Sequence, residues 1–381
     1  MTQLLNVFLR GGADGLSIFA PVGDPIYHRS RPTLALSERA ALDVGIDGFG
    51  LHPSAPRLAE LLKDKKCAVI PAAGFEGQSR SHFSAQALLE SANSAGADPN
   101  EGGTGWLGHL LNSKASKQAQ PFRAVAVGTV SVAPSLWGTT DALSVPDPSA
   151  LAIGVLRRSQ RRNGSYEVMD APFVPSPQEL AARWPLGAGS PEPATAGVAA
   201  AAAVLDRLED SPIEVGDISA FGEGDAAAAF ASASALLLAG LGTEVVQVDL
   251  GDWDTHNEQG TNGGHFAELL SELDAGLGAI FERHVGKAHG LVITVMTEFG
   301  RRVQQNASGG TDHGSGSVAL VLGDGVQGGM KGIWPGLEDL DEGDVRFTND
   351  LRVMQSEVAN AVFGAELAKP SGSTALELFD V

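Results

Sequence analysis

The chain has 381 residues, 43% of them hydrophobic and 19% charged, and its formal net charge is −20. This acidity argues against nucleic acid as the main partner, because a phosphate backbone needs clustered lysine and arginine, and equally against an anionic membrane surface. No apolar run is long enough to span a bilayer, and a single cysteine excludes a disulfide framework within the chain.

Short apolar runs that end in glycine or polar loops predict the strands of a buried sheet. The expected strands cover residues 3–9, 67–71, 124–127, 244–249, 291–296 and 318–322. Helical spacing of apolar residues predicts helices that begin near His82 and that cover residues 196–209, 225–239, 263–283 and 350–363. Strands that alternate with helices indicate a mostly parallel sheet with helices on both faces.

The domain organisation expected from this pattern is a single unit over residues 1–381. Residues 140–190 are poorly periodic and rich in proline, serine and aspartate, and the stretch that follows is rich in alanine. We therefore expect an irregular and partly helical excursion at about residues 130–240, and leave open whether it covers the site. No signal-peptide pattern precedes the first apolar run, which predicts a cytoplasmic protein, or an exported one from which a signal was removed.

Polar clusters follow four of the expected strands. They are Asp14, residues 79–82, the loop from Asp252 to His256, and Glu298, with Asp312 and His313 in a glycine-rich loop beyond. In open α/β sheets, ligands bind outside the carboxyl ends of the strands. We therefore expect these side chains to meet at one edge of the sheet.

Asp254 and His256 are the first metal candidates. They lie two residues apart in a loop, so that one turn can direct both at the same ion, with Asp252 able to replace or assist Asp254. A mixture of carboxylate and imidazole suits zinc, manganese or iron better than calcium. The alternative is an Asx turn before the long helix, with His256 at the surface.

Further metal ligands are expected from the other clusters. Asp14 lies between small residues that let the backbone approach a ligand, although a turn aspartate would look the same. Glu298 ends a very hydrophobic strand and needs a partner, either a metal or the following Arg301 or Arg302. Asp312 and His313 are candidate ligands or a proton donor, or else part of an ordinary polar loop.

The segment Ser79–His82 is the expected catalytic region. Ser81 precedes the predicted helix, where free N–H groups suit an anionic substrate and where its hydroxyl would be a nucleophile; an N-cap is the alternative, and Ser79 is the second candidate. Arg80 could grip an anion, and His82 would orient the site or bind metal.

Seven segments, in order, resemble the domain-of-unknown-function family numbered 1501. They are residues 8–16, 29–34, 49–53, 80–83, 253–256, 298–301 and 310–314, and they span nearly the whole chain. That family in turn resembles the alkaline-phosphatase and sulfatase superfamily. The resemblance implies a three-layer α/β/α sandwich with a metal site at the strand ends.

The resemblance also implies roles for individual residues. Asp14 would match the first-strand metal aspartate, Asp254 and His256 an aspartate–histidine pair, and His313 a late metal histidine. Glu298 stands where the superfamily often has an Asp-His pair, and Ser315 stands where a further histidine is often found in the family, which bears on how many metal ions the site holds.

These observations predict a metal-dependent hydrolase of phosphate or sulfate esters that acts on a small anionic ester. One or two divalent ions, zinc or manganese, would polarise the ester, while Arg80, Arg301 or the helix N-terminus balances the charge of the anion. One alternative is a non-catalytic relative that binds an anion or a partner protein. Another is a mutase that transfers phosphate.

Overall fold

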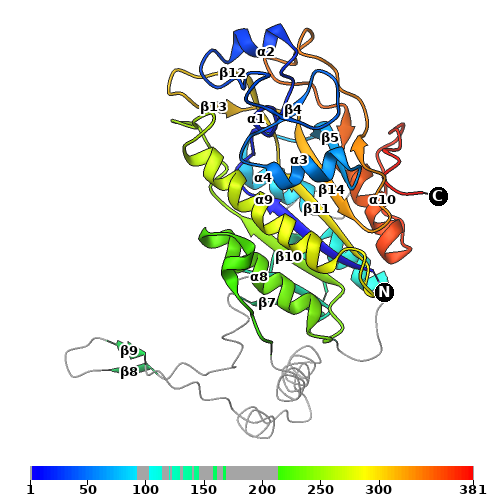
Figure 1. Cartoon of the computed structure of the whole chain (residues 1–381). Coiled ribbons are helices and arrows are strands. Elements are labelled where there is room, and N and C mark those ends of the chain that lie inside the picture. The colour runs from blue at the N-terminus through cyan, green and yellow to red at the C-terminus, as the bar shows by residue number, and fades with distance from the viewer. Residues whose placement is uncertain are drawn as a thin grey trace, which may run out of the picture.

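A computed structural model describes residues 2–91, 103–113, 122–128, 132–139, 141–145 and 213–380, together with residue 120 and two short strands at 158–160 and 166–168. Its main element is a central sheet (Figure 1). The strands follow the order β15 (Gly329–Met330), β5 (Cys67–Gly74), β14 (Ser317–Gly323), β11 (Leu291–Thr297), β1 (Gln3–Leu9), β10 (Val245–Leu250), β6 (Ala124–Val127) and β7 (Ala142–Val145), and β16 (Asn349–Asp350) pairs with β5.

The direction of the strands confirms a mostly parallel sheet. β11, β1, β10, β6 and β7 are parallel neighbours. β14 runs antiparallel to both β11 and β5, so β5 points the same way as the parallel set. The carboxyl ends of β1, β5, β10 and β11 therefore lie at one edge of the sheet, and the beginning of β14 lies there too.

Burial on both faces explains why these strands are continuous apolar runs. In β1, Leu5, Val7 and Leu9 pack into one hydrophobic core, whereas Leu4 and Phe8 pack into the core on the opposite face. Alternation of this kind follows from the period of two in a strand. A sheet that is buried on both sides needs a layer of helices over each face.

The helices supply those layers. The first face is covered by α3 (Pro56–Lys63), α8 (Gly224–Leu238) and α9 (His265–His284), and the second by α4 (His82–Glu90), α5 (Trp106–Ser113) and α10 (Leu351–Phe363) (Figure 1). The expected three-layer α/β/α sandwich is thus confirmed. Helix α4 begins at His82, as the sequence predicts, and α9 is shifted by only two residues at its start.

Smaller elements surround the carboxyl edge of the sheet. They are α1 (Gly15–Ile18), α2 (Pro25–Ser30), the antiparallel sheet of β2 (Phe19–Ala20), β4 (Gly50–Leu51) and β3 (Leu42–Asp43), and the hairpin of β12 (Arg301–Gln305) and β13 (Thr311–His313). A third hydrophobic cluster, which includes Leu16, Tyr27 and Val303, holds these segments together. The loops at this edge are therefore fixed by packing of their own.

The expected excursion at 130–240 is shorter at both ends than the sequence suggested. Residues 142–145 form the edge strand β7, and residues 224–238 form α8, which packs on the sheet. Between them the structure describes β8 (Arg158–Gln160) and β9 (Tyr166–Val168), which pair with each other, and residues 213–223, which include the short 3-10 helix Ile218–Phe221. The expected helix at 196–209 lies outside the described residues. Among the described helices, none is long and apolar enough to cross a membrane.

Candidate metal centre

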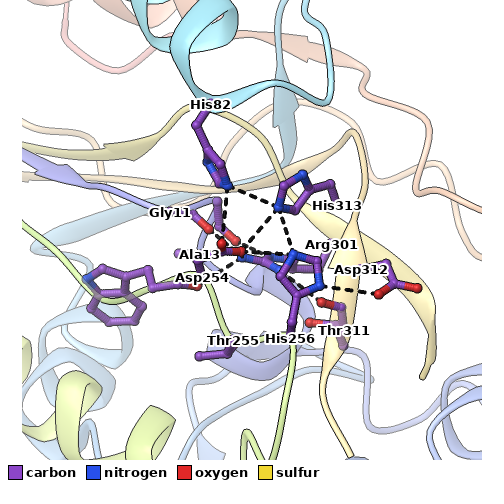
Figure 2. Close-up of polar contacts among 12 residues, drawn as sticks. Gly11, Ala13, His82, Asp254, Thr255, His256, Arg301, Thr311, Asp312 and His313 are labelled. Carbon is purple, nitrogen blue, oxygen red and sulfur yellow. Dashed lines mark hydrogen bonds and ion pairs between the residues drawn. The ribbon is translucent and has the colours of Figure 1, made fainter. Parts of the chain in front are cut away.

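Three histidines and an aspartate meet at the carboxyl edge of the sheet (Figure 2). We call His82, Asp254, His256 and His313 the histidine cluster. The Nε2 atom of His313 lies 3.0 Å from Nε2 of His82, 2.9 Å from Nε2 of His256 and 3.1 Å from Oδ1 of Asp254. Nε2 of His82 is 3.5 Å from the other oxygen of Asp254. Four side chains from three distant segments of the chain thus bring their polar ends together.

The topology explains this convergence. His82 begins the helix that follows β5, and Asp254 and His256 follow β10. His313 precedes β14, which is antiparallel to its neighbours, so that the beginning of this strand lies at the edge where the parallel strands end. The loop with Asp312 and His313 therefore lies at the same edge of the sheet as the carboxyl ends of β1, β5, β10 and β11.

Each imidazole of the cluster is oriented by an acceptor on its other nitrogen. Nδ1 of His82 lies 2.8 Å from Oε1 of Glu298, and Nδ1 of His313 lies 2.8 Å from the carbonyl oxygen of Arg80. Nδ1 of His256 lies 3.3 Å from Oδ1 of Asp312. A carboxylate or carbonyl oxygen only accepts, so Nδ1 carries the proton in each neutral ring.

This arrangement fits a bound cation. With the protons on Nδ1, the lone pair of His313 Nε2 faces those of His82 and His256, and each Nε2 also lies within 3.5 Å of an Asp254 oxygen. None of these groups can donate to the others. His82, Asp254 and His313 each offer a ligand atom within 4.8 Å of the others, and His256 joins them through its contact of 3.2 Å with Asp254. Histidine ligands whose second nitrogen binds a carboxylate or carbonyl are the usual arrangement around zinc.

Glu298 supports the cluster and does not point into it. Its side chain is fully buried, and Oε1 lies near three donors, which are the main-chain nitrogen of Gly11 at 2.9 Å, Nε2 of Gln86 at 2.7 Å and the ring of His82. Burial alone would raise the pKa of Glu298, but hydrogen bonds from Gln86 and His82, among others, outweigh it and lower the pKa. This carboxylate is therefore ionised and directs His82.

Arg301 also has a role different from the expected contact with substrate. Its guanidinium is buried, and all three of its nitrogens donate: Nε to the carbonyl of Gly12, Nη1 to that of Thr311, and Nη2 to Oδ1 of Asp254 at 2.6 Å and to the carbonyl of Gly11. These acceptors belong to the loops after β1 and β10 and to the first residue of β13. Arg301 thus fixes these three segments and lowers the pKa of Asp254 against the opposing effect of burial.

Asp14 lies apart from the cluster, contrary to the expected ligand role. Its carboxylate is fully buried and forms a two-pronged ion pair with Arg31, with distances of 2.5 Å and 2.9 Å. Ser17 and Gln259 donate to the same carboxylate. Burial would raise the pKa of Asp14, but Arg31 prevails and lowers it. The alternative of a turn aspartate fits these contacts better, and the C-cap residue of α2, Arg31, is its partner.

Asp312 and Asp252 also lie outside the group of facing ligand atoms. Asp312 is exposed and accepts a hydrogen bond from Asn306 at 3.0 Å besides its contact with His256, so it orients that histidine. Asp252 is exposed and has a positive φ of 69°, and its carbonyl lies 3.3 Å from the ring of His265. Of the two aspartates in that loop, Asp254 is the one that faces the histidines.

The expected catalytic segment lies beside the cluster. Ser81 is the N-cap of α4, but its side chain makes no capping hydrogen bond, and it is exposed. Its main-chain N–H donates to the hydroxyl of Ser79 at 3.2 Å. Arg80 donates from Nε and Nη2 to one oxygen of Asp344, at 3.2 Å and 2.6 Å. The hydroxyl of Ser81 is thus the freer of the two candidate nucleophiles.

The two loops that carry Asp254, His256 and His313 are joined along their main chains. Thr311 N–H donates to the carbonyl of Thr255, and Gln259 N–H donates to that of Gly309. A Cβ atom at Gly310 would come within 2.4 Å of the carbonyl oxygens of both Thr255 and His256. Glycine is therefore required at this position for the loops to lie so close.

Several supporting residues had no assigned role in the sequence interpretation. Gln86 lies four residues after His82 on the same face of α4, so helical spacing could have identified it. Arg31 and Gln259 lie 17 and 245 residues from their common partner Asp14, and Asn306 lies 50 residues from His256. No spacing rule links such positions.

Comparisons with known proteins support the resemblance noted from the sequence. Residues 198–351 match the model of a family described as a protein of unknown function (DUF1501), which confirms the resemblance over that part of the chain. No curated protein matches the sequence.

Among solved structures, the chain is similar to a protein in the alkaline phosphatase superfamily from Vibrio parahaemolyticus, with a TM-score of 0.37, 12% identity and coverage of 97% of this chain and 70% of that one. It is also similar to the soluble domain of lipooligosaccharide phosphoethanolamine transferase A from Neisseria meningitidis, with a TM-score of 0.30, 11% identity and coverage of 84% and 77%.

Proposed function

We propose that the histidine cluster binds a divalent transition-metal ion and that the protein hydrolyses phosphate or sulfate esters there. The observation that carries this proposal is the convergence of three Nε2 atoms on the Asp254 carboxylate while each Nδ1 faces an acceptor. Three nitrogens and one oxygen are a donor set of zinc or manganese sites, and zinc is the ion we favour.

One ion fits the described residues better than two. The carboxylates that the sequence suggested for a second ion are committed elsewhere, Asp14 to Arg31 and Glu298 to His82, Gln86 and the main chain. Both are buried, so each would have to leave its partners in order to bind a metal. Arg31 already supplies the positive charge that Asp14 needs.

The chain's own groups around the cluster suit an anionic ester. The side chain of Asp254 is 44% exposed, so a ligand can reach this carboxylate from solvent. The N-terminus of α4 adds the positive end of a helix dipole beside His82, and no side chain caps it among the described contacts. A divalent ion bound here would polarise the ester oxygens.

Ser81 is the nucleophile that we favour. Its hydroxyl is exposed, takes part in no described hydrogen bond and is adjacent to His82 along the chain, whereas the hydroxyl of Ser79 already accepts from Ser81 N–H. Attack by the Ser81 hydroxyl oxygen would form a covalent ester with the phosphoryl or sulfuryl group and break the bond to the alcohol oxygen, and the serine proton would leave with the alcohol. Water would then hydrolyse this ester, release phosphate or sulfate and restore the serine hydroxyl.

The first test is the metal content of the purified protein by elemental mass spectrometry. We expect about one ion per chain, as in other sites with four protein ligands. The variant with Asp254→Ala and His256→Ala should lose it, whereas the exposed His289→Ala, which lies outside the cluster, should keep it. A parent protein without metal after incubation with zinc or manganese would reject the metal centre.

Activity is measured on the same samples with 4-nitrophenyl phosphate and 4-nitrophenyl sulfate. Ser81→Ala should keep its metal and lose hydrolysis, and Ser79→Ala should keep both. Metal-loaded protein that cleaves no ester across a broad panel would refute the hydrolase and support the alternative of a protein that binds an anion without catalysis.

A further inference from the structure

A buried carboxylate shared by two arginines lies at the rim of the histidine cluster. Only 3% of the Asp344 side chain is exposed, and one of its oxygens lies 2.6 Å from Nη2 of Arg80. The other oxygen lies 3.8 Å from Nε of Arg302 and has no hydrogen-bond partner among the described residues. The side chains of Arg80 and Arg302 are 41% and 40% exposed. Asp344 therefore positions two guanidinium groups whose other edges reach solvent.

Both arginines are connected to the histidine cluster, Arg80 through its main-chain carbonyl and Arg302 through its neighbour in the sequence, Arg301. The carbonyl of Arg80 is the acceptor that orients His313. Arg302 follows Arg301, which holds Asp254, and its backbone pairs with that of Asp344. Arg302 is also near Asp312, and its positive charge helps to lower the pKa of that carboxyl, after the larger effects of Asn306 and His256. The pair thus flanks the side of the cluster that carries His313.

Acidic side chains lie around both arginines. Asp344, together with Glu342 and Asp341, raises the pKa of Arg80, and Asp312 is the acid near Arg302. Glu342, 3.7 Å from Arg80, is the only other acid within ion-pair distance of this pair among the described residues, and its side chain is 80% exposed. Two hydrogen bonds to the buried Asp344 preorganise the Arg80 guanidinium as a donor for an anion, and the Arg302 guanidinium lies beside the same carboxylate at 3.8 Å.

We propose that Arg80 and Arg302, held by Asp344, form a subsite for a second anionic group of the substrate. The substrate class is then an ester whose phosphate or sulfate group binds at the histidine cluster and whose alcohol portion carries a further negative charge, such as a carboxylate. This inference rests on the proposed function, because it assumes that the first anionic group binds at the cluster.

The test uses two ligands that contain no ester bond and that differ in one group. Propylphosphonate carries a single phosphonate, and 3-phosphonopropionate carries a carboxylate in place of its terminal methyl group. Both are titrated into the metal-loaded, full-length protein by calorimetry. We expect 3-phosphonopropionate to bind about 10- to 100-fold more tightly, as one charge-assisted hydrogen-bonded pair provides.

The variant Arg302→Gln should remove most of this difference while it leaves the metal content and the binding of propylphosphonate unchanged. Asp344→Asn, which frees both arginines, should reduce the difference as well. Arg346→Gln is the matched control, because Arg346 is a half-exposed arginine paired with Asp339 in the neighbouring segment. It should keep the full difference.

The outcomes separate the two proposals. Equal binding of the two phosphonates, or a preference that persists in Arg302→Gln, would overturn the subsite while the cluster still binds its anion. If neither phosphonate binds better to metal-loaded than to metal-free protein, the proposed function itself fails, and the subsite with it.

Discussion

His82 and Glu298 are joined by a hydrogen bond of 2.8 Å between Nδ1 and Oε1, although 216 residues separate them in the chain. The carboxylate is fully buried and holds three donors on one oxygen. Glu298 therefore controls both the proton position and the direction of the ring that faces the other histidines. Glu298 would act on the proposed metal ion only through His82, and this role can be tested by mutation.

Glu298→Gln should weaken metal binding without abolishing the fold. The amide keeps the size of the side chain but loses the charge that favours the proton on Nδ1, and loss of such partners typically lowers metal affinity about 10- to 100-fold. Competition with a chromophoric chelator measures the affinity. Glu268→Gln, at an exposed position on α9, is the control and should have no effect. Unchanged affinity in Glu298→Gln would show that the hydrogen bond does not matter for the ion.

Gly310→Ala should push apart the two loops that carry Asp254, His256 and His313. The new methyl group would lie within 2.4 Å of two carbonyl oxygens, and overpacking of this kind costs about 1–3 kcal/mol. We expect both a lower free energy of unfolding and a weaker metal site, measured by urea denaturation and chelator competition. Gly251→Ala is the matched control, because nothing lies within 4 Å of its Cβ. Equal behaviour of the two variants would contradict the close approach.

Arg31→Met should be among the most destabilising substitutions in the chain. It leaves the Asp14 carboxylate buried without its cation, and breaking a buried pair from one side costs about 3–5 kcal/mol. The exposed pair of Lys63 and Asp43 is the comparison, and Lys63→Met should lower the free energy of unfolding far less, because solvent screens an exposed ion pair. Urea denaturation gives both values. A small loss in Arg31→Met accompanied by a second bound metal ion would restore Asp14 as a ligand.

Asp274 should make the stability depend on pH between about 4 and 6. This carboxylate on α9 accepts hydrogen bonds from the main-chain nitrogens of Leu58 and Arg57 and so caps α3, whose own N-cap residue, Ala55, has no side-chain oxygen. Burial nevertheless raises the pKa of Asp274 to about 6, against these hydrogen bonds and the charge of Arg57, while Glu60 adds to the rise.

The free energy of unfolding should fall as the pH rises through this range, because the folded state binds the proton more tightly than the unfolded state does. Between the two pKa values the folded state holds a proton that the unfolded state has lost, so the favourable contribution is complete below the unfolded pKa and disappears as the pH rises through about 6. Its size is up to about 3 kcal/mol, from about 1.4 kcal/mol per pKa unit. Asp274→Asn should remove this slope in urea denaturation at pH 4 to 7, and Glu282→Gln, exposed on the same helix, should retain it.

The sequence determined the strands and helices because the pattern of apolar residues within a short segment shows which of its faces are buried. The apolar runs at 3–9 and 124–127 are β1 and β6 without any shift, and the helix expected from His82 begins there. The alternation of strands with helices along the chain predicted a mostly parallel sheet. The polar residues that follow the strands predicted the edge of the sheet at which the candidate site lies. His82, Asp254, His256 and His313 were all named as site residues on that basis.

Only the tertiary structure decided which of the polar groups face one another. The antiparallel direction of β14 brings His313 to the cluster, and the contacts of Glu298, Arg301 and Asp14 give these residues supporting positions instead of direct ones. The reason is physical. Whether a carboxylate points at an ion or at a donor depends on hydrogen bonds between residues up to 287 positions apart, and these become possible only once the sheet has formed.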